Sequence, residues 1–205
     1  MRLFVAIVPP AAALGELDAA TAALRPAWPG LRWTSIDAWH VTLAFFGEVE
    51  WAVADRLALR LERAAQRHPS LTLSFAGAGA FPGDARARVL WTGVQGDRHA
   101  LTALAASMTA AGRREDVLPR EKGKTFRPHL TLARCRAPAD VRTLVAGLGD
   151  YAGGPWTAGR IHLIRSHPGA RPRYETVGSW PLHSQHENPA VHPPAEPPAG
   201  VTPDA

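Results

Sequence analysis

One short motif occurs twice in this chain, at matching places of a repeated pattern. The two copies, His40 to Leu43 (HVTL) and His129 to Leu132 (HLTL), start roughly 89 residues apart. Around each copy, hydrophobic spacing predicts the order strand, helix, motif strand, helix, strand, first over Leu3 to Ala76 and again over Val89 to Ser166. A period this long that appears only twice favours two pseudo-twofold lobes over a solenoid. We therefore expect a groove between the lobes.

Each motif is predicted to present two polar side chains on one face of a strand. Successive strand residues point to opposite faces, so residues two apart share a face at a spacing of roughly 6 to 7 Å. His40 and Thr42 then face the groove on one side, and His129 and Thr131 face it on the other. The intervening hydrophobic residues point to the core.

A site of two imidazoles and two hydroxyls suits chemistry at phosphorus. Imidazoles with a pKa near 6.5 can be one neutral and one protonated near neutral pH, so that one acts as base and the other as acid. Hydroxyls and arginines can donate to the remaining phosphate oxygens. A single copy of such a motif is typical of a half-buried strand, but two equivalent copies favour catalysis. The expectation is a reaction that needs neither metal nor cofactor.

Composition excludes several other classes of protein. The chain has 205 residues, 46% of them hydrophobic and 20% charged, which suits one sizeable domain or two small lobes with a shared core. The single Cys135 excludes an intramolecular disulfide and a multi-cysteine metal site. No apolar run reaches the roughly 18 residues of a membrane span. We expect a cytoplasmic monomer with no membrane partner.

Charge divides the chain into a basic domain and an acidic tail. Residues 184–205 are rich in proline and contain three acidic residues and no Lys or Arg, so we predict a disordered tail. The predicted domain, residues 1–183, then holds 23 basic against 15 acidic residues, and eight of the basic ones lie between Arg113 and Arg136. This surplus suggests an anionic partner such as nucleic acid, although a solvated charged face is an equal alternative.

Together these segments resemble the 2H phosphoesterases, in particular the RNA 2′,3′-cyclic phosphodiesterase (2′-5′ RNA ligase) family. The resemblance covers residues 1 to about 183. It rests on the two segments that contain the motifs, His40 to Gly47 and Phe126 to Arg134. Three further segments match as well: Arg88 to Trp91, Leu163 to Ser166 and Tyr174 to Leu182. It implies a bilobal α+β fold, with two antiparallel sheets flanked by helices around a central groove.

The resemblance also implies an activity and roles for the motif residues. The activity is hydrolysis of an RNA or nucleotide 2′,3′-cyclic phosphate to a 2′-phosphomonoester, together with a reversible 2′-5′ RNA ligase activity. His40 matches the histidine that protonates the leaving 3′ oxygen, and His129 matches the one that activates water. Thr42 and Thr131 match the phosphate-binding hydroxyls. Which histidine is acid and which is base stays open, because a ligation run in reverse exchanges the roles.

Three further residues are candidates for substrate binding. Arg134 lies where the family often has a substrate arginine, but period-two counting sends it to the face opposite His129, so a groove role requires a twist or strand end. Arg127 has the matching parity. Phe46 shares parity with His40, so its ring could stack on a nucleobase, whereas Phe45 has the parity of the core.

Two other classes of function remain as alternatives. The chain could be a non-catalytic protein that binds RNA ends in the same basic groove, although binding alone does not explain two equivalent imidazoles. It could also be a metallohydrolase, but neither motif brings a second ligand at metal spacing. The unrepeated His68, His99, His162 and His167 are interpreted as surface or structural residues. The choice among RNA ends, tRNA fragments, 2′-5′ oligonucleotides and mononucleotides is open.

Overall fold

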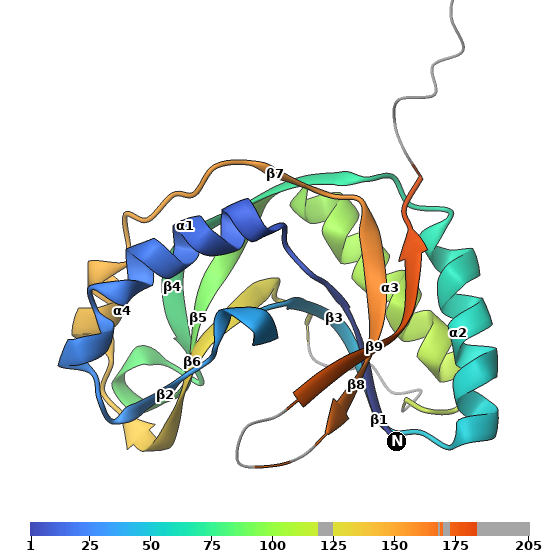
Figure 1. Ribbon diagram of the computed structural model, residues 1–205, viewed down its shortest axis with the longest axis horizontal. Helices are drawn as coiled ribbons and strands as arrows, with labels where there is room; N and C mark the ends of the chain where they lie inside the picture. The colour runs from blue at the N-terminus through green and yellow to red at the C-terminus, as the bar shows by residue number, and fades with distance from the viewer. Residues whose placement is uncertain (119–124, 168, 170–172, 184–205) are drawn as a thin grey trace, which may run out of the picture.

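The computed structural model describes residues 1–118, 125–167, 169 and 173–183, and these form a strongly curled antiparallel sheet with helices outside it (Figure 1). The predicted tail lies outside the described residues. The strands follow the order β7-β4-β5-β6-β3-β1-β8-β9, and β2 pairs with β6. Their bounds are β1 Arg2–Ile7, β2 Leu31–Trp33, β3 Val41–Glu48, β4 Leu71–Phe81, β5 Ala87–Gly96, β6 His129–Ala139, β7 Trp156–Ala158, β8 Arg160–His167 and β9 Arg173–Pro181.

The strand order reads as two equivalent halves. Under the sequence repeat β1, β3 and β4 correspond to β5, β6 and β8, and this exchange maps β4-β5-β6 onto β8-β1-β3. Each half therefore takes one strand from the other repeat. The halves are joined by β3 and β6, which pair only at Val41 and Leu130. The predicted α+β fold with two antiparallel lobes is confirmed, and a single residue pair makes the two sheets formally continuous.

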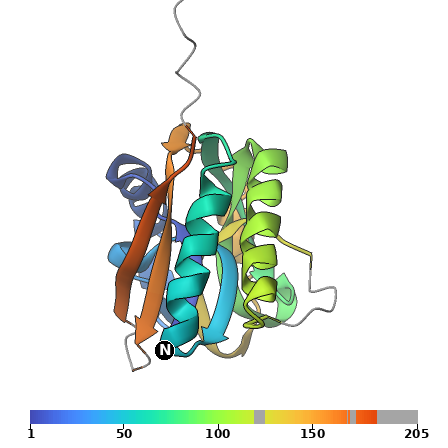
Figure 2. The same cartoon turned by 90° about the vertical axis from the view of Figure 1, so that its right-hand side faces the viewer.

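Two pairs of helices cover the outside of the sheet. Helices α1 (Ala11–Ala22) and α4 (Arg142–Gly147) lie over the half that contains β4, β5 and β6 (Figure 1). Helices α2 (Trp51–Ala65) and α3 (Arg98–Arg114) lie side by side over the other half (Figure 2). The apolar stripes predicted for α2 and α3 are largely buried, for example at Leu57 and Leu104. None of the described helices is long and apolar enough to cross a membrane.

A β-bulge interrupts each motif strand at the same place. On β3, Thr42 pairs with Ala6 but Ala44 pairs with Val5, so Leu43 is the extra residue. A bulge adds one residue to one strand and so reverses the face to which the following side chains point.

The second motif repeats this irregularity. On β6, Thr131 pairs with Trp91 and Ala133 pairs with Leu90, which leaves Leu132 as the extra residue. Simple alternation therefore fails beyond this point in both motifs.

The glycine-rich segment after Ala76 continues β4 as far as Phe81. Gly79 pairs with Trp91, and a Cβ atom on Gly79 would lie 2.4 Å from the Trp91 indole. The glycine lets the indole lie flat across the neighbouring strand, which hydrophobic spacing alone does not reveal. The short strands β2 and β7 were also not predicted.

Candidate active site

Both motifs meet at the junction of the two halves. His40 directly precedes β3, and His129 is the first residue of β6. Because Val41 pairs with Leu130, the antiparallel register places His40 towards Thr131 and Thr42 towards His129. All four predicted motif residues are therefore brought together around one residue pair.

The two imidazoles are oriented by the same local hydrogen bond. Nδ1 of His40 lies 2.8 Å from the carbonyl oxygen of Ala38, and Nδ1 of His129 lies 2.6 Å from that of Arg127. A carbonyl can only accept, so Nδ1–H donates in each case and Nε2 is the basic atom of the neutral ring. The short turn Ile36–Ala38 supplies the first of these carbonyls. Each motif thus positions its histidine through the residue two places before it.

His40 is enclosed by aromatic rings. Its ring centroid lies 4.7 Å from that of Phe4, and the ring of Tyr174 meets it edge-on at 5.2 Å. Burial lowers the pKa of His40 to about 4, and the nearby charges of Arg134 and His129 act in the same direction. In the free protein this imidazole is therefore neutral at pH 7.

His129 lies on the more open side of the site. Phe81 meets it edge-on at 5.0 Å, and Trp91 lies 6.2 Å away. Burial and then Arg134 lower its pKa, and the hydrogen bond to Arg127 opposes them. The hydrogen bond of its ring is solvent-exposed, whereas that of His40 is partly buried. Water thus has the easier approach to His129.

Arg134 lies close to both catalytic-site imidazoles, although strand alternation sends it to the opposite face. The bulge at Leu132 reverses the alternation, and the guanidinium of Arg134 acts on the pKa of both histidines. Its cross-strand partner on β2 is Arg32, so a second arginine lies beside it. The change of face that Arg134 needs for a role in the groove is therefore produced by the bulge at Leu132.

Phe46 is not a groove residue, which corrects the prediction from parity. Phe46 is only 4% exposed and packs under α3, where a Cβ atom on Gly112 would lie 2.8 Å from its ring. Phe45 is 46% exposed instead, and Arg2 lies 5.0 Å over its ring. The bulge at Leu43 is the cause, since it turns Phe45 to the face of Thr42.

A groove of about 1040 Å³ opens where β3 and β6 diverge. Thr42 and Phe45 line it from one half, and His129 and Arg127 line it from the other. Arg127 therefore reaches the groove as its parity predicted. Further lining comes from Phe81, Pro82, Arg88, Val89 and Phe126.

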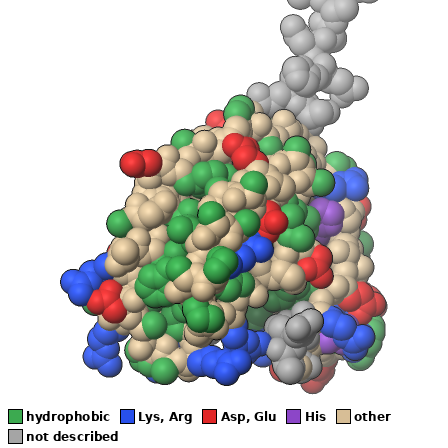
Figure 3. Space-filling model, turned by 60° about the vertical axis from the view of Figure 1, so that its left-hand side comes forward, with side chains coloured by type: hydrophobic (Ala, Val, Ile, Leu, Met, Phe, Trp, Pro, Cys, Tyr) green, Lys and Arg blue, Asp and Glu red, His purple; other side chains and the backbone are tan. Residues whose placement is uncertain are grey.

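The structure describes only part of the basic segment, Arg113 to Arg136. Arg113 and Arg114 end α3, whereas Arg120, Lys122 and Lys124 lie outside the described residues. One face of the molecule shows basic side chains gathered along its lower edge (Figure 3). Within the described ranges, no three His, Cys, Asp or Glu side chains lie close enough to hold a metal ion.

Sequence reasoning missed several residues of this site. Phe4, Tyr174 and Phe81 contact the imidazoles, and Phe45 lines the groove. A signal existed for Phe45, because extending the repeat beyond each motif aligns it with Arg134. The other three come from strands far from the motifs in sequence, and only the sheet order brings them in.

Two equivalent half-sheets that meet at paired His-x-Thr strands define a two-histidine phosphoesterase. The chain belongs to the 2′-5′ RNA ligase superfamily, whose family model matches residues 9–170.

Individual relatives agree with this assignment. The chain is 30% identical to an RNA 2′,3′-cyclic phosphodiesterase of Thermus thermophilus, over 98% of this chain and 100% of that one. It is also 30% identical to a protein of the same name from Aquifex aeolicus, where the match spans 58% of this chain and under two thirds, 63%, of the relative. The crystal structure of Escherichia coli LigT complexed with 3′-AMP superimposes with a TM-score of 0.73 at 28% identity, covering 88% of this chain and 97% of that chain.

Proposed function

We propose that this protein hydrolyses the 2′,3′-cyclic phosphate of RNA ends or nucleotides to a 2′-phosphomonoester, without a metal ion. The observation that carries the proposal is the pair of imidazoles, each held by an Nδ1 hydrogen bond to the carbonyl two residues earlier, on adjoining strands. Relatives named RNA 2′,3′-cyclic phosphodiesterase and the neighbour complexed with 3′-AMP support the coarser activity of a cyclic phosphodiesterase on nucleotides.

The difference in solvent access suggests how the proton roles divide. His129, on the open side, takes a proton from water as the water oxygen bonds to phosphorus. His40 gives a proton to the 3′ oxygen as the phosphorus–O3′ bond breaks. Burial holds His40 neutral in the free protein, so it takes up this proton when the anionic phosphate arrives and raises its pKa. One proton is gained and one is lost, so the pair is reset by exchange with solvent.

Other residues at the junction of the two halves bind the substrate. Thr42 and Thr131 donate to the non-bridging phosphate oxygens, and Arg134 adds positive charge beside them. Phe45 offers an exposed ring on which a nucleobase can stack, with Arg2 against it. When an RNA 5′-hydroxyl takes the place of water, the new bond joins phosphorus to O5′, the phosphorus–O3′ bond breaks, and the product is a 2′-5′ linkage with a free 3′-hydroxyl. The two histidines keep their roles in this ligation and exchange them when it runs in reverse.

The test is hydrolysis of a 2′,3′-cyclic phosphate oligonucleotide in EDTA, with the position of the product phosphate assigned. We expect a 2′-phosphate product. Replacing either histidine, in His40→Asn or His129→Asn, should lower kcat/KM by at least about 10²-fold, because each acid or base typically contributes that much. His99→Asn, on the exposed start of α3, is the matched control.

Three outcomes would contradict the proposal. A requirement for added metal would remove the two-histidine proton mechanism. A loss of less than tenfold in both histidine variants would remove these residues from the chemistry. Tight binding of the oligonucleotide without turnover would identify a protein that binds RNA ends.

A further inference from the structure

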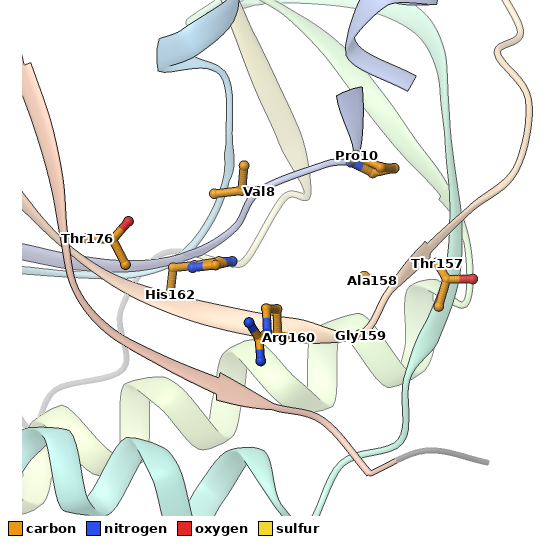
Figure 4. Close-up of a pocket in the computed structure, with 8 residues that line it drawn as sticks. All are labelled: Val8, Pro10, Thr157, Ala158, Gly159, Arg160, His162 and Thr176. Atoms are coloured by element: carbon orange, nitrogen blue, oxygen red, sulfur yellow. The ribbon is translucent and has the colours of Figure 1, made fainter. Parts of the chain in front are cut away.

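A second cavity, of about 300 Å³, lies apart from the groove residues described above. It is bounded by the segment that follows β1, by the start of β8, by β9 and by β7 (Figure 4). The residues that supply its polar groups are Thr157, Arg160, His162 and Thr176. None of these has a part in the proposed reaction.

The pseudo-twofold relation shows that His162 has no polar counterpart in the other half. In that half Trp91 pairs with the motif residue Thr131, and its other neighbour is Gly79. In the half that holds the cavity the residue corresponding to Trp91 is Ala6, which pairs with Thr42 and with His162. His162 therefore takes the place of Gly79 and adds an imidazole that the repeat does not require.

The polar groups of this cavity are suited to an anion. The ring of His162 points from β8 into the space below Val8 and Pro10 (Figure 4). Arg160 precedes it by two residues and lines the same cavity, Thr176 lies on the side of His162, and Thr157 lies at the opposite end (Figure 4). No carboxylate is among the lining residues in the described part of the chain.

The electrostatics of His162 agree with a positive local field. Burial lowers the pKa of His162, and the charge of Arg160 lowers it further. Its Nδ1 atom is buried and has no hydrogen-bond partner among the described residues. An anion beside Arg160 would offset both effects.

The cavity is close enough to the motif strands to share a substrate with them. Ala6 on β1 lies between Thr42 on β3 and His162 on β8. Adjacent strands are about 4.8 Å apart, so the backbones at Thr42 and His162 are separated by on the order of 10 Å. A nucleotide whose cyclic phosphate lies at the motif strands can therefore place its 5′ phosphate in this cavity.

We propose that the His162 cavity is a second anion subsite, which binds the phosphate on the 5′ side of the nucleotide that carries the cyclic phosphate. This inference rests on the proposed function and deepens it, because the subsite makes the enzyme prefer RNA ends over unphosphorylated mononucleotides. Arg160 and His162 act as substrate-binding residues, and the hydroxyl of Thr176 donates to the same phosphate.

The experiment compares a nucleoside 2′,3′-cyclic phosphate with the same compound carrying a 5′-phosphate. In the wild type the 5′-phosphate should lower KM by about tenfold with little change in kcat, because the extra contact is uniform binding. Arg160→Gln should abolish this advantage and leave the compound without a 5′-phosphate unaffected. His162→Gln should reduce the advantage in the same way. Arg142→Gln, which removes an equal charge from the exposed start of α4 over the other half, is the control and should retain it.

The outcomes separate this subsite from the proposed function. If the wild type hydrolyses both compounds with the same KM, or if Arg160→Gln keeps the advantage, the subsite is wrong and the activity stands. If a dinucleotide gains affinity but the 5′-phosphorylated mononucleotide does not, the cavity does not recognise the phosphate and the inference also fails. If neither compound is hydrolysed, the proposed function itself is wrong.

Discussion

At the scale of single residues, the two imidazoles share one hydrogen-bond geometry but differ in burial. His40 packs between Phe4 and Tyr174, whereas His129 has an exposed hydrogen bond and an easier path for water. A buried neutral imidazole opposes protonation, so its environment is a source of pH-dependent stability as well as of reactivity.

This difference predicts how stability depends on pH. The pKa of His40 is 6.5 when unfolded and about 4 when folded, so its stabilising contribution is complete above pH 6.5 and is lost as the pH falls towards 4. The contribution amounts to at most about 3 kcal/mol. Urea unfolding of His40→Gln between pH 7.5 and 4.5 should show a shallower loss than the wild type. An unchanged slope would contradict the buried neutral state, and His99→Gln should leave the slope as it is.

Replacing each of the two adjacent phenylalanines, Phe45 and Phe46, should have a different effect, one on substrate binding and the other on stability. Phe45→Ala removes a stacking surface, which is worth about 1 to 3 kcal/mol per base, and should raise KM for a cyclic nucleotide with little change in stability. Phe46→Ala opens a cavity under α3 and should cost about 3 to 5 kcal/mol of unfolding free energy. Steady-state kinetics and urea unfolding of both variants measure this. The reverse pattern would restore Phe46 as the groove residue.

At the scale of elements, paired strands with matching bulges build the site. Both bulges fall one residue after the motif threonine, and both turn the third residue after that threonine to the groove face. That residue is Phe45 in one half and Arg134 in the other. The same kind of bulge therefore supplies an aromatic surface from β3 and a positive charge from β6.

Strand β4 supports His129 indirectly: the backbone of Gly79 lies against the indole of Trp91, and this indole lies beside the His129 ring. Gly79→Ala places a methyl group 2.4 Å from the Trp91 ring, which must move away from Phe81 and His129. Overpacking of this kind costs about 1 to 3 kcal/mol, and kcat should fall with it because His129 loses a neighbouring ring. Gly83→Ala is the control, since its Cβ would meet nothing within 4 Å. Equal behaviour of the two variants in unfolding and turnover would show that the indole does not position His129.

At the scale of the whole molecule, the basic surplus is predicted to matter only for longer substrates. Residues 1–183 contain 23 basic and 15 acidic residues. If the basic segment follows an RNA backbone, log affinity for an oligonucleotide should fall with log salt by about 0.7 for each phosphate contacted. Mononucleotide hydrolysis should change less. Measuring kcat/KM for both substrates from low to high salt tests this, and equal sensitivity would argue against an extended RNA site.

The sequence by itself determined the duplicated plan of this protein and the positions of its four candidate catalytic and phosphate-binding residues. His40, Thr42, His129 and Thr131 are local signals, because alternation over three residues places each pair on one face and the repeat places the pairs in equivalent strands. The superfamily membership and the α+β architecture follow from the same segments.

Only the tertiary structure decided what surrounds those four residues. A bulge shifts the register by one residue and reverses the later side chains, and hydrophobic spacing does not reveal it, so counting by twos sends Phe45 and Arg134 to the wrong face. The aromatic rings beside the imidazoles come from distant strands, and so do the residues that line the His162 cavity. Contacts between strands far apart in sequence are set by the sheet order, which no local pattern encodes.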